Sequence, residues 1–190
     1  NYISAAVADA SDPRHFGGST AKYDLVGRLL ATQRTKGADK GLFGSQAPTY
    51  DGAFRQGLAL TALAVTHVSP ADPRVRAGIA WLKKQQCANG LWQPYRANVK
   101  VPCGAANPTT FSGPDTNSTS LAVQGLAAWG SHPRKARVLS ALKTIQTADG
   151  GFPYIAAKNG FTDPSSTALT IQALIAESSS PASAKWNKSA

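Results

Sequence analysis

Apolar residues follow a helical period through most of the chain, in two kinds of segment. In the first kind they recur every three or four positions, opposite Lys and Arg, in residues 22–33, 74–86 and 134–146. This pattern is typical of helices with one solvated side. The second kind contains no charged residue at all, in residues 56–65, 116–129 and 165–176. Because a helix that is apolar on nearly all sides is buried on nearly all sides, we expect inner helices covered by outer ones.

Each outer segment ends in a glutamine that is followed by a glycine and an aromatic residue. The clearest copy contains Gln86, Gly90 and Trp92. The second copy repeats this spacing with Gln146, Gly150 and Phe152, and a looser third, with a longer turn, has Gln33, Gly41 and Phe43. Self-similarity of this kind indicates one helix–turn–helix unit that is copied along the chain.

Prolines mark the same phase of the repeat, at Pro13, Pro73, Pro133 and Pro181. Proline in the first turn of a helix removes no hydrogen bond that the helix would make, so we expect each of them to begin an outer helix. The inner helices are expected to begin near Gly52, Asp115 and Asp163. The pattern predicts about seven helices in one domain that spans residues 1–190, with the first ten residues as the end of an inner helix.

The best copy carries a family resemblance. Gln86, Gly90 and Trp92, with Arg76 and Trp81 upstream, resemble the QW motif of squalene–hopene cyclases and the wider prenyltransferase and squalene-oxidase repeat. The resemblance covers roughly residues 20–178 and implies an all-α, partial (α/α) toroid of outer and inner helix hairpins.

The resemblance also implies roles for the motif residues. In that family the glutamine and the aromatic residue tie outer helices together, so the motif residues are implied to be structural: Gln86, Gly90, Trp92, Gln146, Gly150 and Phe152. The superfamily includes terpene cyclases, protein prenyltransferase β-subunits, intrinsic-factor-like cobalamin carriers and complement thioester domains, so the fold does not decide the function. Toroids of this family have more helices than we expect here, and the chain starts without a methionine or a signal peptide, so we expect a fragment of a longer repeat protein.

The residues that define the enzymes of this superfamily are missing. The Asp-x-Asp-Asp acid of the terpene cyclases does not occur, and the three histidines show no zinc-ligand spacing with either cysteine. The run Cys103-Gly104-Ala105 lacks the glutamine of a thioester domain. We therefore expect no catalytic residue, no metal and no cofactor, and we favour a protein that is not an enzyme.

The two cysteines and the charge bear on location and partners. Cys87 and Cys103 flank a polar loop and are either two buried thiols or, as the loop favours, a disulfide, which would indicate a secreted or cell-surface protein. The net charge is +10, carried largely by the outer segments. It is either solvated surface or attracted to an anionic cell-wall or membrane surface. We expect no nucleic-acid partner, because no basic and aromatic docking motif occurs, and no transmembrane segment.

Short polar clusters stand where the inner helices are expected to begin. Their candidate residues are Tyr50, Asp51, Asp115, Asn117, Asp163 and Ser165. One interpretation is helix capping, since Asp and Ser side chains accept bonds from unpaired amides. In toroids of this family, however, the starts of the inner helices form the rim of the central cavity, which indicates a small or hydrophobic ligand.

Our leading hypothesis is a non-catalytic extracellular module for ligand binding or surface interaction. One alternative is a fragment of a terpene-cyclase-like or prenyltransferase-like enzyme without its acid motif. The other is a purely structural or adhesive domain of the cell surface.

Overall fold

The computed structural model describes residues 2–17, 22–44, 51–156 and 160–187. The only regular secondary structure in these residues is helical, with no β-strand. The helices within them are α1 (Tyr2–Ala8), α2 (Leu25–Ala31), α3 (Ala53–Val65), α4 (Pro73–Lys84), α5 (Thr116–Ala127), α6 (Lys135–Ile145) and α7 (Pro164–Ala176). The all-α prediction is confirmed.

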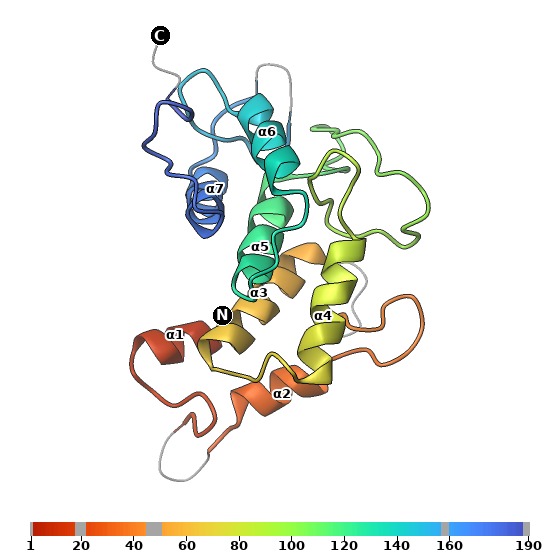
Figure 1. The fold of residues 1–190 in the computed structure, drawn as a ribbon, viewed down its shortest axis with the longest axis vertical. Coiled ribbons are helices and arrows are strands. Elements are labelled where there is room, and N and C mark those ends of the chain that lie inside the picture. The colour runs from red at the N-terminus through yellow and green to blue at the C-terminus, as the bar shows by residue number, and fades with distance from the viewer. Residues whose placement is uncertain (1, 18–21, 45–50, 157–159, 188–190) are drawn as a thin grey trace.

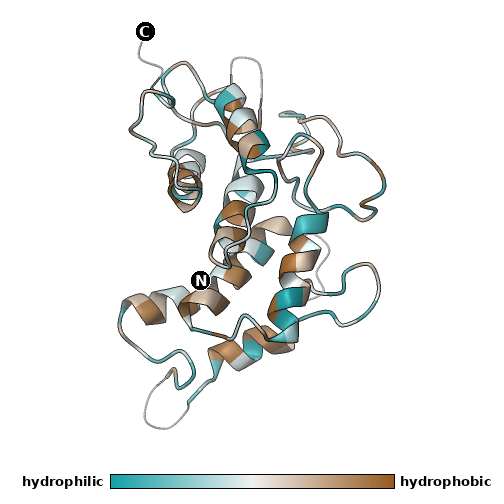
Figure 2. Cartoon of the chain, in the orientation of Figure 1, coloured by the Kyte–Doolittle hydropathy of each residue, from teal (hydrophilic) through white to brown (hydrophobic). Residues whose placement is uncertain are grey.

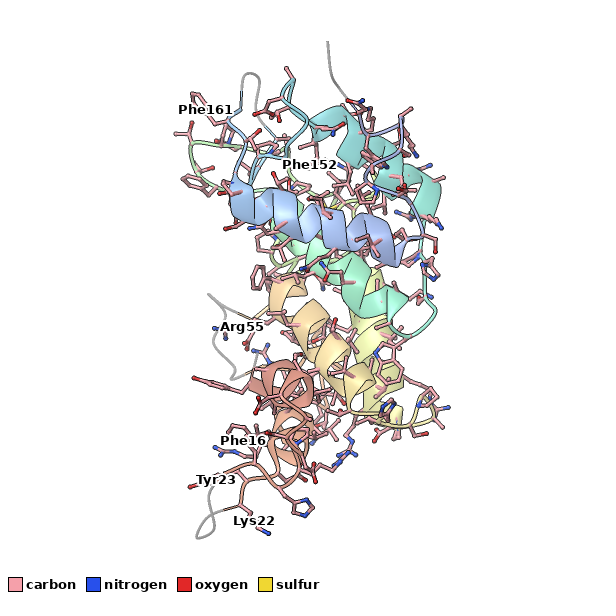
Figure 3. All side chains as sticks on the ribbon, turned by 90° about the vertical axis from the view of Figure 1, so that its left-hand side faces the viewer. Phe16, Lys22, Tyr23, Arg55, Phe152 and Phe161 are labelled. Atoms are coloured by element: carbon pink, nitrogen blue, oxygen red, sulfur yellow. A yellow bond between two sulfur atoms is a disulfide. The ribbon has the colours of Figure 1, made fainter. Side chains whose placement is uncertain are left out.

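The helices form an inner and an outer row. The helix α3 packs against α5, and α5 packs against α7, so that the three uncharged segments lie side by side. Figure 1 shows α1, α3, α5 and α7 along the inside of an open arc, with α2, α4 and α6 around its outside. In Figure 3 the three long inner helices α3, α5 and α7 start on the same side of the molecule.

Small residues let the inner helices approach closely. A Cβ atom added to Gly57 of α3 would overlap the backbone carbonyl of Leu121, and one added to Gly125 of α5 would overlap the backbone of Gly57. Backbone atoms therefore touch where α3 and α5 cross. Hydrogen bonds join α5 to α7, between the hydroxyls of Ser120 and Thr170 (3.2 Å) and from the Gln124 amide to the Leu169 carbonyl (3.1 Å).

The outer helix α4 shows how the sequence pattern becomes a two-sided helix. Pro73 occupies its first turn, and the Asp72 carboxylate accepts the backbone amide of Arg74 at 2.8 Å. Trp81 and Leu82 are buried, with the Trp81 ring stacked on Tyr95, whereas the Lys and Arg side chains of the helix are exposed. Figure 2 shows this alternation of hydrophilic and hydrophobic residues along α4, in contrast to the mostly apolar α3 and α7.

The prolines predicted only some of the helix starts. Pro73 begins α4 and Pro133 lies two residues before α6. Pro13, however, lies in a turn, α2 begins at Leu25 with Asp24 as its cap, and the described residues after Pro181 form no helix. Asp12 does accept the amide of Arg14, as Asp72 accepts that of Arg74. The residues that follow Pro13, however, lack the helical apolar spacing, so the capped turn does not continue into a helix.

Candidate functional site

Each motif glutamine joins two parts of the repeat through its side-chain amide. The Gln86 Nε2 donates to the carbonyl of Gly90 at 2.9 Å and to that of Pro133 at 3.0 Å. The corresponding acceptors are Gly41 and Arg74 for Gln33, and Gly150 and Trp186 for Gln146. In each case the first acceptor lies in the glutamine's own turn and the second lies at the start of the following unit. The glutamine therefore links consecutive repeats.

The motif aromatic residues are core residues. Trp92 is 0% exposed and Phe152 is 2% exposed, which is consistent with a structural role. The Trp92 indole Nε1 donates to the Leu82 carbonyl at 2.8 Å. The backbone amides of the two aromatic residues donate to the hydroxyls of Thr119 and Thr167, both at 2.9 Å. The turn is thus fixed to the inner helix that follows it.

The first repeat achieves the same contact with a different side chain. There the amide of Phe43 donates to the Gln56 side-chain oxygen at 2.8 Å. Gln56 lies four residues after Gly52, the N-cap of α3, and Thr119 lies four residues after Asp115, the N-cap of α5. The alignment of the inner helices therefore pairs Gly52, rather than Asp51, with Asp115.

A disulfide joins Cys87 to Cys103, as predicted, and neither cysteine is free. The loop between them is held by Arg96, which sequence reasoning missed. Its guanidinium donates to five backbone carbonyls, those of Lys84, Gln85, Gln86, Val99 and Val101. Three of these carbonyls end the helix α4, where a positive charge is stabilising. A single arginine within a polar loop gives no sequence signal for this role.

The start of α5 is buried and incompletely hydrogen-bonded. Asp115 is 2% exposed, and its Oδ1 accepts the amide of Ser118 at 2.6 Å. Burial outweighs the hydrogen bonds from Ser118 and Asn117 and raises the pKa of Asp115 to about 6. Within the described residues, three neighbouring side-chain oxygens have no hydrogen-bond partner, namely Asp115 Oδ2, Thr116 Oγ1 and Asn117 Oδ1. A donor such as an ordered water is needed to satisfy them.

The start of α7 has the same kind of cap, but its carboxylate is more exposed to solvent. Asp163 accepts both the amide and the hydroxyl of Ser166, each at 2.6 Å, and these bonds lower the pKa of Asp163. Ser165 is exposed. The two predicted rim residues of α7 are therefore a capping carboxylate and a surface hydroxyl.

The start of α3 differs from both. Gly52 is the N-cap and offers no side chain, while the buried Asp51 pairs with Arg34 at 2.9 Å and with Arg55 at 3.5 Å. The capping interpretation of the polar clusters therefore does not hold for Asp51, because the residue lies one position before the N-cap. Tyr50 lies outside the described residues.

An apolar hollow of about 340 Å³ lies between α1, α2 and α3. Its lining is formed by Tyr2, Ile3, Leu25, Leu29, Arg55, Leu58, Ala59 and Ala62. Figure 3 shows Arg55 at the start of α3, above α1. Through its ion pair, Arg55 connects the hollow to Asp51. Sequence reasoning placed the first residues in an inner helix but did not predict this hollow. It predicted α2 as residues 22–33, longer than the observed Leu25–Ala31. A hydrophobic pattern also does not show which other helices α2 packs against.

Comparison with known proteins found no matching family model and no matching curated protein. Within the described ranges, no group of three or more His, Cys, Asp or Glu side chains is placed to hold a metal ion. None of the helices in these ranges has the length and apolarity needed to cross a membrane.

Proposed function

We propose that this chain is a non-catalytic, extracellular ligand-binding module built from repeats of the QW type, arranged as part of an (α/α) toroid. The bonds of Gln33, Gln86 and Gln146 support the repeat, because each links one unit to the start of the next. The disulfide supports an extracellular location, since disulfides persist in oxidising compartments.

The apolar hollow between α1, α2 and α3 is the observation that carries the binding function. Its volume of about 340 Å³ falls within the range of small-molecule sites, roughly 300–1,000 Å³. Apolar side chains from three different helices line it, and Arg55 and Tyr2 supply polar groups at its edge. Sites of this kind bind by burying apolar surface and orient the ligand with a few polar groups.

The expected ligand is therefore a small, largely apolar molecule with one polar end. The Arg55 side chain is 44% exposed at the hollow and already neutralises Asp51. It suits a hydroxyl or carbonyl acceptor on the ligand better than it suits a second full negative charge. This chemistry fits a binding protein, and it assigns no group to protonate or attack the ligand.

An uncharged fluorescent probe tests this proposal. N-phenyl-1-naphthylamine becomes fluorescent in apolar surroundings, and its lack of charge avoids nonspecific attraction to a protein of net charge +10. We expect saturable binding of about one probe per chain, because one ligand-sized hollow is proposed as the site.

Two matched substitutions locate the probe. Leu29→Gln places an amide in the wall of the hollow, and Ile175→Gln makes the same kind of change on the exposed face of α7. Binding should weaken by about tenfold in the first variant, since an unpaired amide in an apolar site costs on the order of 1–3 kcal/mol. It should hardly change in the second. Absence of saturable binding, or equal loss in both variants, contradicts the proposal.

A further inference from the structure

The positive charge of this protein is concentrated in one part of the chain. Residues 73–145 contain ten of the 20 Lys and Arg residues but one of the ten Asp and Glu residues, Asp115. That carboxylate is buried at the start of α5. The rest of the chain is close to electrically balanced. The excess charge therefore belongs to the second and third repeats rather than to the molecule as a whole.

The outer helices α4 and α6 place this charge on one surface. Neither helix contains an acidic residue, and their exposed basic side chains are Arg74, Arg76, Lys83, Lys84, Lys135 and Arg137. Acidic partners meet two of them: Asp72 pairs with Arg74 at 2.7 Å, and Glu177 lies 3.8 Å from Lys135. We call Arg76, Lys83, Lys84, Lys135 and Arg137 the basic outer surface.

Hydrogen bonds bring the end of α4 against the start of α6. Gln86 donates to the Pro133 carbonyl, and Arg137 Nη1 donates to the Ala88 carbonyl at 2.7 Å. The two lysines that end α4 and the basic residues that begin α6 therefore flank a single junction. Figure 1 shows both helices on the outer side of the arc.

The composition of this surface distinguishes between anionic partners. No large apolar side chain of α4 or α6 is exposed, and the exposed apolar side chains of the loop that Arg96 holds at the end of α4 are two valines, Val99 and Val101. Proteins that lie on membranes insert larger side chains such as Trp, Phe and Leu between the lipids, so a lipid surface is poorly matched. A row of Lys and Arg on a convex helical surface instead fits the phosphates of a linear polymer. Each such contact releases a counterion that was condensed on the polymer, and this release favours binding.

We propose that the basic outer surface binds a linear polyphosphate chain rather than a nucleic acid, because α4 and α6 expose no aromatic side chain on which bases could stack. The binding is electrostatic and independent of the ligand site, because none of the residues of the basic outer surface lines the hollow. It should weaken as salt concentration rises, since exposed charges are screened over about 8 Å at physiological ionic strength.

Two charge-reversal variants with the same change in net charge test the proposal. Arg76→Glu/Lys83→Glu/Lys84→Glu alters the basic outer surface. Arg14→Glu/Lys22→Glu/Arg28→Glu changes three exposed basic side chains of the first repeat, of which Lys22 is labelled far from α4 and α6 in Figure 3. Binding to immobilised long-chain polyphosphate is measured by biolayer interferometry over a range of salt concentrations. Circular dichroism and the N-phenyl-1-naphthylamine titration check that both variants are folded.

The surface variant should bind polyphosphate at least about tenfold more weakly than the unmodified protein, with a shallower salt dependence, because it loses phosphate contacts. The first-repeat variant should bind polyphosphate with an affinity within about threefold of that of the unmodified protein, since its changes act on the basic outer surface only at long range. Equal weakening of both variants overturns the proposal in favour of net charge. The proposal is also overturned if the unmodified protein does not bind polyphosphate at physiological salt. This holds whether or not the protein binds vesicles that contain phosphatidylglycerol.

Discussion

The side-chain amide of Gln86 donates a hydrogen bond to the carbonyl of Pro133, 47 residues further along the chain. This bond connects the turn of one repeat to the entry of the next outer helix. Its counterparts at Gln33 and Gln146 end at Arg74 and Trp186. A glutamine suits this position because its amide carries two donors, and each copy uses them for one contact within the repeat and one across it.

Gln86→Ala is expected to lower the free energy of unfolding by about 1–3 kcal/mol, because the carbonyls of Gly90 and Pro133, in a buried and a partly buried bond, lose their donor. Urea unfolding followed by circular dichroism measures the change. Gln172→Ala provides the control, since Gln172 is exposed on α7. It should change stability by less than about 0.5 kcal/mol. Equal effects of the two substitutions would contradict the linking role of Gln86.

Trp92→Phe should be much milder than Trp92→Ala. Phe43 and Phe152 occupy the corresponding place in the other repeats, so an aromatic ring of that size is compatible with the turn. The phenylalanine loses the bond from Nε1 to the Leu82 carbonyl, at a cost of about 1–3 kcal/mol. The alanine also loses the buried ring, at about 3–5 kcal/mol. Thermal or urea unfolding of both variants should rank them in this order, and similar losses would contradict it.

The disulfide is expected to be present in the purified protein and to stabilise it. Thiol labelling of the denatured, unreduced chain should detect no free cysteine. The Cys87→Ser/Cys103→Ser variant should lose about 3 kcal/mol, because the bridge closes a loop with a sequence separation of 16 residues. Two labelled thiols per chain would refute both the bond and the location inferred from it.

The turns after the outer helices were predictable because they depend on the spacing of a few residue types. The glutamine, the glycine and the aromatic residue have the same spacing at Gln86 and Gln146 and a longer turn at Gln33. Their positions identified the boundary between outer and inner helices. The prolines were less reliable, because Asp12-Pro13 and Asp72-Pro73 make the same capped turn and only the second is followed by a helical apolar pattern.

The tertiary roles of single residues were not predictable. Arg96 contacts carbonyls from both ends of its loop, which are brought together by folding and by the disulfide. Gln56 replaces a threonine hydroxyl with a longer side chain, so the first repeat does not look like the others in sequence. The hollow depends on how α1 and α2 pack against α3, and no local pattern contains that information.

Asp115 should make stability depend on pH. Burial raises its pKa from 3.8 to about 6 in the folded protein. The folded state therefore holds a proton more tightly than the unfolded state, and this contribution to stability is lost as the pH rises from about 4 through 6. Asp115→Asn keeps an oxygen for the Ser118 amide but cannot ionise.

The Asn variant should accordingly lose this part of the pH dependence and gain on the order of 2 kcal/mol relative to the unmodified protein at neutral pH. Urea unfolding at a series of pH values between 4 and 8 measures both effects. An unchanged pH profile in the variant would show that Asp115 is ionised without cost, and hence better hydrated than its burial indicates.

The central claim, that this chain binds a small apolar molecule without transforming it, is tested most directly with farnesol. The protein is incubated with farnesol, separated from unbound molecules by gel filtration, and extracted, and the extract is identified by gas chromatography with mass spectrometry. The account predicts about one farnesol per chain, because one ligand-sized hollow is proposed as the site. It also predicts that the recovered molecule is unchanged. Extracts without farnesol would contradict the binding function, and a cyclised or dehydrated product would show that the chain is an enzyme.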